Sequence, residues 1–280
     1  MRYQTFRNIV MAYILRVMPN PFGRYRGRYR FYQRIKNSDL ILKRKIRHSG
    51  IMLPLNLGDW IQYWMFMEGA YEKQLVDFLR PRVMGKIFFD IGANVGSYTL
   101  ALSKSAARTY SFEASSSNAA VLRNFVKLSG LDTIEVVNQA VSNHTGENIS
   151  IYSSPDTGGN NTQFCDFGKG CETVSTITLD QFVADNSIDH VDVIKIDIEG
   201  SELAAFQGAR DLLSKSHPII LVEFHALVAK QANWELVELY DFLKSYGYNA
   251  YELNRDELVP FDRSRLSHPE FYSNLIFLTN

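Results

Sequence analysis

Apolar and polar residues alternate in a regular order along most of the chain, from about residue 68 onward. Short apolar runs bounded by glycine or polar residues predict strands, and segments with a 3.6-residue apolar period predict helices. Strands are expected at 86–91, 109–113, 134–141, 148–152, 173–178, 191–198, 218–224, 248–253 and 274–278. Helices are expected at 71–79, 97–105, 116–128, 179–184, 201–213 and 233–245.

This order predicts an α/β fold, in which helices cover both faces of a mostly parallel sheet. No helix-length segment separates the last two strands, so they are expected to pair as neighbours. Ligands of such sheets bind beyond the carboxyl ends of the strands, at the point where the strand order reverses. The residues at which strands end are therefore the first candidates for function.

The beginning of the chain has a different character. The 280 residues carry 30 basic and 30 acidic side chains, but residues 1–50 hold 13 Lys and Arg and one acid, Asp39. Apolar and aromatic residues recur at helical spacing from Tyr3 to Met18, before Pro19 and Pro21. We therefore divide the chain into a basic N-terminal helical arm, 1–67, and a main domain, 68–280.

Three interpretations of the basic arm remain open at this stage. It could fold back on the acidic body, remain a solvated arm, or dock on an anionic membrane surface. A basic helix with an apolar, aromatic face suits a lipid interface better than nucleic acid, so no nucleic-acid partner is expected. The apolar run from Ile9 to Leu15 is too short for a signal peptide or a membrane span, which predicts a cytoplasmic protein, peripheral at the membrane if the arm docks there.

The first strand of the main domain ends in Phe89-Asp90-Ile91-Gly92-Ala93-Asn94-Val95-Gly96. Gly92 and Gly96 allow a tight turn and a close approach of the backbone to a ligand. A dinucleotide fingerprint would need a third glycine, and Asp90 suits a cationic ligand better than a pyrophosphate. The alternative is an ordinary glycine-rich turn without a ligand.

The second strand ends in Glu113, where a carboxylate could accept hydrogen bonds from both hydroxyls of a ribose. Without the glycine turn before it, Glu113 would be taken for a surface acid.

The strand at 191–198 carries charges in an apolar setting. Because strand side chains alternate, Lys195, Asp197 and Glu199 share the face opposite the isoleucines 194, 196 and 198. Three charges on a central strand are costly to bury unless they pair or act in catalysis. The next strand ends in Glu223 and His225, near the same edge. A structural ion pair between Lys195 and a neighbouring carboxylate is the alternative interpretation.

These motifs resemble those of the FkbM-type methyltransferases. The segment 89–96 is similar to that family's cofactor loop, and Thr178-Leu179-Asp180 with 194–202 is similar to its second signature. Ala140-Val141-Ser142, Gly208-Ala209 and Glu72 also fit, so the resemblance covers about 68–278. One departure is Glu113-Ala114, where family members often show Glu-Pro. The acid is kept, and a different turn after it is expected.

The resemblance implies a Rossmann-like class I methyltransferase fold, with seven strands and the last one antiparallel. It implies methyl transfer from S-adenosylmethionine, usually to a hydroxyl of a glycan, a lipid-linked sugar or a secondary metabolite. In that family pattern Asp90, Gly92, Asn94 and Gly96 would hold the methionine part, Glu113 the ribose, and Ala140 the adenine edge. Glu72 would join the cofactor site, and Asp197 would lie between cofactor and acceptor.

The base that accepts the hydroxyl proton is sought among Asp197, Glu199, Glu223 and His225, with Lys195 orienting a carboxylate. The same carboxylates could instead bind Mg²⁺ and polarise the acceptor oxygen, although no metal ligand is assigned from the sequence. The polar loop that carries Gly158, Gly159, Asn160, Asn161 and Phe164 is a candidate substrate lid. Cys165 and Cys171 support neither a disulfide scaffold nor a zinc site.

Two other functions remain open. In one, the cofactor fold survives as a non-catalytic scaffold that binds S-adenosylmethionine without turnover. In the other, the sheet belongs to a nicotinamide-dependent oxidoreductase, which the missing glycine disfavours.

Overall fold

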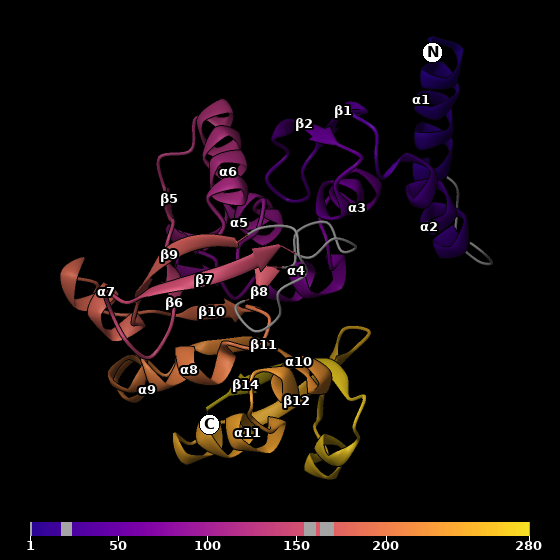
Figure 1. Cartoon of the computed structure of the whole chain (residues 1–280). Helices are drawn as coiled ribbons and strands as arrows, with labels where there is room; N and C mark the ends of the chain where they lie inside the picture. The colour runs from indigo at the N-terminus through magenta and orange to yellow at the C-terminus, as the bar shows by residue number, and fades with distance from the viewer. Residues whose placement is uncertain (1, 18–23, 154–160, 163–170, 280) are drawn as a thin grey trace.

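The fold is that of a computed structural model of the chain, in which residues 2–17, 24–153, 161–162 and 171–279 are described. Figure 1 shows one body with the N-terminal helices at one side. The helices are α1 (Arg2–Val17), α2 (Arg24–Ile35), α3 (Trp60–Glu68), α4 (Lys73–Leu79), α5 (Ser97–Leu102), α6 (Ser116–Ser129), α7 (Leu179–Asp185), α8 (Glu202–Gln207), α9 (Arg210–Ser216), α10 (Ala226–Gln231) and α11 (Leu236–Ser245), with a 3₁₀ turn at Arg263–Ser267.

Three sheets are present in the described part of the chain. The strands are β1 (Ile41–Lys45), β2 (Met52–Asn56), β3 (Ile87–Ile91), β4 (Arg108–Phe112), β5 (Ile134–Val137), β6 (Ala140–Val141), β7 (Asn148–Ser153), β8 (Asn161–Thr162), β9 (Cys171–Ile177), β10 (Val193–Ile196), β11 (Ile219–His225), β12 (Asn249–Asn254), β13 (Glu257–Pro260) and β14 (Tyr272–Leu278). The main sheet has the order β13-β12-β14-β11-β10-β3-β4-β5.

The main sheet confirms the expected α/β architecture. Strands β5, β4, β3, β10 and β11 run parallel, and β14 enters antiparallel between β11 and β12. The last two expected strands pair as neighbours, as β12 and β14. The sheet has eight strands rather than seven because β13 forms a hairpin with β12 at the edge. The order reverses between β3 and β10, which predicts a ligand site there.

Two expected elements are each divided in two. The strand expected at 134–141 breaks at Asn138, whose side-chain amide donates to the carbonyl oxygens of Glu113 and Ala114, both at 2.9 Å. Its first half stays in the main sheet as β5, and its second half, β6, joins the small sheet β6-β9-β7-β8. The helix expected at 201–213 ends at Gly208, where a Cβ would lie 2.3 Å from the Ser142 carbonyl oxygen.

Apolar cores fill both faces of the main sheet, as the alternation of strand side chains requires. Phe89 and Ile194 belong to the core under α7–α11, whereas their neighbours Phe88 and Val193 belong to the core under α3–α6. Each central strand is thus apolar on two sides, which explains its nearly continuous apolar sequence.

The N-terminal segment packs on the second of these cores. Phe31, Leu53 and Tyr63 belong to the same buried cluster as Phe88, so apolar residues from both sides of residue 67 share one core. The antiparallel hairpin β1–β2 was not expected within the helical arm. The division at 67/68 itself stays a prediction. Most of the candidate lid lies outside the described residues, and Asn161 enters β8.

Candidate functional site

A cavity of about 440 Å³ opens at the carboxyl ends of β3, β4, β10 and β11. Its size is in the range of sites for cofactors and small molecules. Five carboxylates and one ammonium group line it, those of Glu72, Glu113, Asp197, Glu199, Glu223 and Lys195. Among the described residues that line the cavity, Lys195 is the one lysine, and no arginine is among them. The cavity is therefore acidic and suits a cationic ligand.

Asp90 is buried near the end of β3, just before the glycine loop. Thr99 donates two hydrogen bonds to Asp90 Oδ2, from its backbone N–H at 3.0 Å and from its hydroxyl at 2.6 Å. The other oxygen, Asp90 Oδ1, is buried and has no hydrogen-bond partner among the described residues. Burial raises the pKa of Asp90, while Lys195 and the Thr99 bonds oppose that shift.

Close packing requires glycine at two positions of this loop. A Cβ at Gly92, where φ is +72°, would lie 1.8 Å from the Asp197 carbonyl oxygen. A Cβ at Gly96, where φ is +91°, would lie 2.3 Å from Leu122. The two glycines thus let the loop after β3 pack against the segment after β10 and against α6.

Asn94 and Glu113 are joined directly. The Asn94 backbone N–H donates to Glu113 Oε2 at 2.7 Å, and the Ser115 backbone N–H donates to Oε1 at 2.9 Å. Asn94 adopts a left-handed backbone with φ of +52°, and its own side chain accepts from the Val95 N–H at 2.8 Å. Burial raises the pKa of Glu113 to about 7, against the lowering effect of these bonds. Each carboxylate oxygen keeps a second lone pair for a ligand hydroxyl.

Lys195 connects the two signature segments. It pairs in register with Asp90 of β3, and its ammonium donates to the Gly92 carbonyl oxygen at 2.9 Å. The ammonium lies 3.9 Å from Asp90 Oδ1 and 3.8 Å from Asp197 Oδ2. Burial alone would lower the pKa of Lys195, but Asp197 and the other carboxylates outweigh it and raise that pKa. The ion pair expected as one alternative is thus present, and it forms part of the cavity wall.

Glu72 lies in the cavity wall with both oxygens engaged. The Tyr98 hydroxyl donates to Oε2 at 2.7 Å, and the Asn274 amide donates to Oε1 at 2.9 Å. Its φ of +49° is left-handed, as at Asn94 and Glu199. Backbone strain of this kind concentrates at functional sites. Burial raises the pKa of Glu72, and Asp197 adds to the shift.

Ala140 lies on the small sheet and lines the apolar side of the cavity. It packs with Ile151, Ala114 and Ile149. Ala140 was predicted for the cofactor site, whereas the two isoleucines were not. Their spacing on the strand at 148–152 placed them on one face, but nothing in the sequence indicated that this face meets the site.

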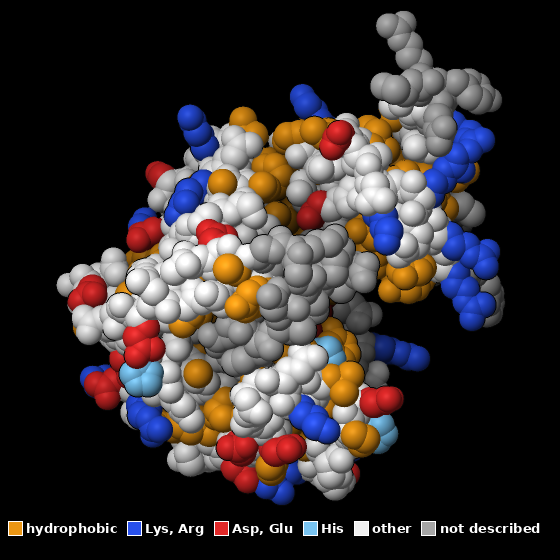
Figure 2. Space-filling view, viewed as in Figure 1, with side chains coloured by type: hydrophobic (Ala, Val, Ile, Leu, Met, Phe, Trp, Pro, Cys, Tyr) orange, Lys and Arg blue, Asp and Glu red, His pale blue; other side chains and the backbone are white. Residues whose placement is uncertain are grey.

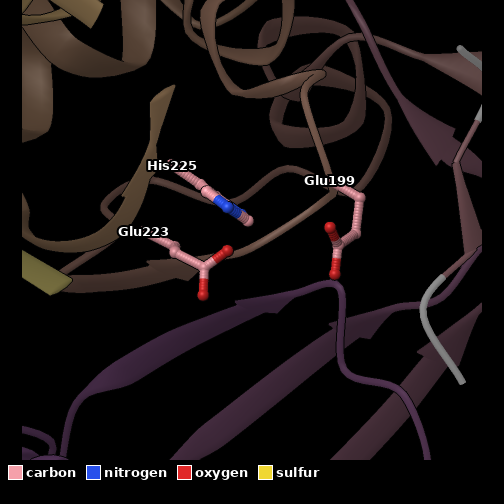
Figure 3. Close-up of side chains that lie close together, drawn as sticks. All are labelled: Glu199, Glu223 and His225. Carbon is pink, nitrogen blue, oxygen red and sulfur yellow. The ribbon is translucent and has the colours of Figure 1, made fainter. Parts of the chain in front are cut away.

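Glu199, Glu223 and His225 converge from two neighbouring strand ends (Figure 3). One ligand atom from each lies within 4.8 Å of the others. Lys195 pairs in register with Leu221 of β11, so Glu223 and His225 extend along the same face of the sheet. The sequence prediction that these groups would meet at one edge agrees with this geometry.

Burial sets the protonation of this cluster. Burial, together with the Asp197 charge, raises the pKa of Glu199 to about 8 and that of Glu223 to about 10. Burial lowers the pKa of His225. Near pH 7 both carboxyls therefore hold protons, whereas the imidazole is neutral and can accept one.

Aromatic residues that were not predicted for the site form a further part of the cavity wall, called here the aromatic wall. Tyr29, Tyr32 and Trp60 come from α2 and α3. The Trp60 ring lies 4.8 Å from Tyr32 and 6.2 Å from Tyr29, measured between centroids. Tyr29 stands between Arg28 and Arg30 in the basic segment 1–50, whose charge gave no sign of a role in the site.

Comparison with solved structures finds distant likenesses. An FkbM methyltransferase from Methylobacillus flagellatus KT is 16% identical, with a TM-score of 0.47 over 99% of this chain and 60% of that chain. This chain thus spans about 60% of that chain's length, which is less than two thirds. SMU.1697c from Streptococcus mutans, solved in complex with SAH, is 9% identical (TM-score 0.44, 75% of this chain, 97% of that chain). An rRNA methylase from Streptococcus thermophilus is 11% identical (TM-score 0.45, 75% of this chain, 96% of that chain).

A comparison with curated proteins found no match. The model of the methyltransferase FkbM domain matches residues 90–250, more than half of the 280 residues. The match includes the glycine loop, Glu113 and the Glu199–Glu223–His225 cluster, and it leaves out Glu72 and the aromatic wall. The chain therefore belongs to the FkbM methyltransferase family.

Proposed function

We propose that this protein is an S-adenosylmethionine-dependent O-methyltransferase that acts on a hydroxyl of a glycan, a lipid-linked sugar or a secondary metabolite. The observation that carries the proposal is the cavity at the carboxyl ends of the strands, whose wall carries five carboxyl groups and one ammonium group. When bound, S-adenosylmethionine supplies an electrophilic methyl group on a sulfonium. A positive sulfonium is stabilised by those carboxyl groups of the cavity wall that are ionised.

The described residues fit such a cofactor at three points. Gly92 and Asn94 of the glycine loop line the cavity and face the methionine part. Glu113 offers the free lone pairs of a carboxylate to the ribose hydroxyls. Ala140, Ile149 and Ile151 offer an apolar wall to a flat base. Lys195 fixes the Gly92 carbonyl and balances part of the negative charge.

His225 is our candidate for the proton acceptor. Its imidazole lies among Glu199 and Glu223 in the cavity, and no hydrogen bond holds its ring nitrogens among the described residues. The lowered pKa keeps the ring neutral, whereas the raised pKa values of Glu199 and Glu223 make those carboxyls proton donors near pH 7. A group that must take a proton needs to be unprotonated at the working pH. Asp197 pairs with Lys195, so we assign it a role in positioning that side chain rather than in accepting the proton.

The charge of the cavity also bears on the oxidoreductase alternative. A nicotinamide dinucleotide carries a pyrophosphate, which would lie among carboxylates with one ammonium group beside it. Pyrophosphate sites instead offer a helix N-terminus and an open glycine loop. The Gly92 turn is filled by the Asp197 carbonyl, which leaves no such approach.

Thermal unfolding with and without S-adenosylhomocysteine tests the cofactor. At about 1 mM ligand and a Kd of about 10 μM, binding adds about 2.7 kcal/mol to the stability. For a chain of this size that raises Tm by about 5–10 °C. We expect the shift to be lost in Asp90→Ala, kept in the exposed variant Asp189→Ala, and absent with NADH. A shift with NADH and none with S-adenosylhomocysteine would contradict the proposal.

Turnover distinguishes an enzyme from a binding scaffold. We expect methyl-labelled S-adenosylmethionine to transfer label to a glycan or lipid fraction, and His225→Asn to abolish the transfer while keeping the thermal shift. Cofactor binding without label transfer to any hydroxyl-bearing fraction would favour the scaffold.

Glu199, Glu223 and His225 also offer a second mechanism, in which they hold a divalent cation that polarises the acceptor oxygen. Its supporting observation is that their ligand atoms all lie within 4.8 Å of one another. Titration with Mn²⁺, followed by electron paramagnetic resonance, separates the two mechanisms. Binding that is lost in Glu223→Gln and kept in the exposed variant Glu257→Gln would support the cation, and absence of binding would leave His225 as the base.

A further inference from the structure

Helix α1 carries an apolar stripe on its outer face. Ala12 is fully buried on the inner face, against the core that α3 shares. On a helical projection at 100° per residue the opposite side carries five exposed residues, Phe6, Val10, Tyr13, Ile14 and Val17. Phe6 is 65% exposed and Val17 is 73% exposed. An apolar helical stripe that faces outward is typical of an interaction surface.

Helix α2 carries the basic half of this surface. Arg26, Arg30 and Arg34 follow one another at four-residue spacing and are exposed. Figure 2 shows Lys and Arg side chains gathered at the side of the molecule where Figure 1 places α1 and α2, with hydrophobic side chains beside them.

The two helices are fixed to the body and to each other. Arg28, on the inner face of α2, is buried and pairs with Glu68 of α3. Its guanidinium also donates to the carbonyl oxygens of Leu15 and Arg16, at 3.1 and 3.2 Å, which ties the end of α1 to α2. Arg28 thus anchors the helices, whereas Arg26, Arg30 and Arg34 remain exposed.

We propose that the outer faces of α1 and α2 form a docking surface for an anionic lipid bilayer. Charge complementarity selects this partner, because an exposed arginine row beside an exposed apolar stripe matches anionic headgroups beside acyl chains. Among the described residues no helix is long and apolar enough to cross a bilayer, so the contact is interfacial. Acidic protein partners would match the arginines but would leave the apolar stripe without a counterpart.

The surface is continuous with the cavity through α2. Tyr29 and Tyr32 line the cavity, while Arg26 and Arg30 of the same helix lie outside. A bilayer docked on α2 would therefore lie beside the aromatic wall, where a sugar ring carried on a lipid could enter. This step rests on the proposed methyl transfer, whereas the docking itself does not.

Vesicle flotation tests the surface. We expect the full chain to float with vesicles of phosphatidylcholine and phosphatidylglycerol at low salt, and to be released at about 0.5 M NaCl, where charges are screened over less than about 8 Å. The triple variant R26E/R30E/R34E should lower the partition coefficient by about 100-fold or more, since each basic residue near an anionic surface contributes about 1 kcal/mol. Phe6→Ser with Ile14→Ser should also lower the partition coefficient by about 100-fold or more, since burial of a Phe or Ile side chain contributes about 1.5–3 kcal/mol.

A matched control reverses three exposed lysines away from this surface, K104E/K127E/K230E, and should float like the wild type. The thermal shift with S-adenosylhomocysteine should persist in all variants, so that failure of docking and failure of cofactor binding are distinguishable. Equal flotation of the arginine and the lysine variants would overturn the proposal. Absence of flotation, together with a dimer that Phe6→Ser and Ile14→Ser dissociate, would assign the stripe to a second copy of the chain instead.

Discussion

The Asp197 carbonyl oxygen occupies the space that a side chain at Gly92 would need, since an ideal Cβ there would lie 1.8 Å from it. The Asp197 N–H also donates to the Ile91 carbonyl oxygen at 3.2 Å, so the backbones of the two signature motifs are in direct contact. The motif after β3 and the motif after β10 therefore depend on each other for their shape. A change at residue 92 should displace Asp197 from the cavity.

Gly92→Ala and Gly85→Ala form a matched pair that tests this contact. Both glycines have positive φ, +72° and +69°, but a Cβ at Gly85 meets nothing within 4 Å. We expect Gly85→Ala to cost about 1–2 kcal/mol of unfolding free energy, the cost of a left-handed backbone. Gly92→Ala should cost more and also abolish the thermal shift with S-adenosylhomocysteine. Equal stability and equal ligand shifts in the two variants would show that the contact is not required.

Arg28→Met tests whether the N-terminal helices depend on one buried guanidinium. The change removes the pair with Glu68 and the bonds to Leu15 and Arg16. Because Glu68 is partly exposed, we expect a loss of about 2–3 kcal/mol, below the range for fully buried pairs. Hydrogen exchange in α1 and α2 should accelerate by about 30-fold or more, while the main sheet stays protected.

Arg30→Met is the control for that experiment, since Arg30 is exposed on the same helix. It should leave exchange in α1 and α2 close to the wild type. If Arg28→Met accelerated exchange in β3 and β10 as much as in α1, the N-terminal helices and the sheet would form one cooperative unit.

The order of strands and helices in the main sheet followed from periodicity alone. The parallel strands are apolar on both faces, so their sequences stand out, and the polar strand ends mark the cavity. Two expected elements were wrong in extent because one local contact divides each of them. Asn138 leaves the strand to donate to two backbone carbonyls, and Gly208 packs on the Ser142 carbonyl. Such contacts join residues far apart in the sequence, and no periodic pattern carries them.

The charged half of the site could be predicted, and the aromatic half could not. Lys195, Glu223 and His225 meet because strand alternation and parallel pairing place them on one face. Tyr29 and Trp60 reach the cavity only through the packing of α2 on α3, which depends on the buried Arg28 and on stacked rings such as Tyr25 on Trp64, 5.3 Å apart. The sequence pattern of α2 showed its charge but not which face turns inward.

Glu113 predicts a pH dependence of stability. Its pKa in the folded protein is about 7, raised by burial from an ordinary value of 4.5. Between these two values the folded protein holds a proton that the unfolded chain has released, so stability falls as the pH rises through this interval. Glutamine resembles the protonated carboxyl, so Glu113→Gln should remove up to about 3 kcal/mol of that fall.

Urea unfolding between pH 4.5 and 7.5 measures this effect in the absence of ligand. The exposed variant Glu257→Gln should retain the wild-type slope. An unchanged slope in Glu113→Gln would mean that the hydrogen bonds from Asn94 and Ser115 keep the carboxylate ionised in the fold.

Lys195→Met should destabilise the protein by an amount that depends on pH. At pH 7.5 the variant leaves the carboxylates of Asp90 and Asp197 without their nearest cation, and we expect a loss of about 3 kcal/mol, as for other broken buried pairs. Burial already raises the pKa of Asp90, and removal of Lys195 raises it further, so acid protonates this carboxyl first. The attraction to Lys195 is then lost from the wild type as well.

The difference in unfolding free energy between wild type and Lys195→Met should therefore narrow as the pH falls from 7.5 to 4.5. Urea unfolding measures this difference, and the exposed variant Lys104→Met should match the wild type throughout. A difference that stays constant with pH would assign the role of Lys195 to its hydrogen bond with the Gly92 carbonyl oxygen rather than to its charge.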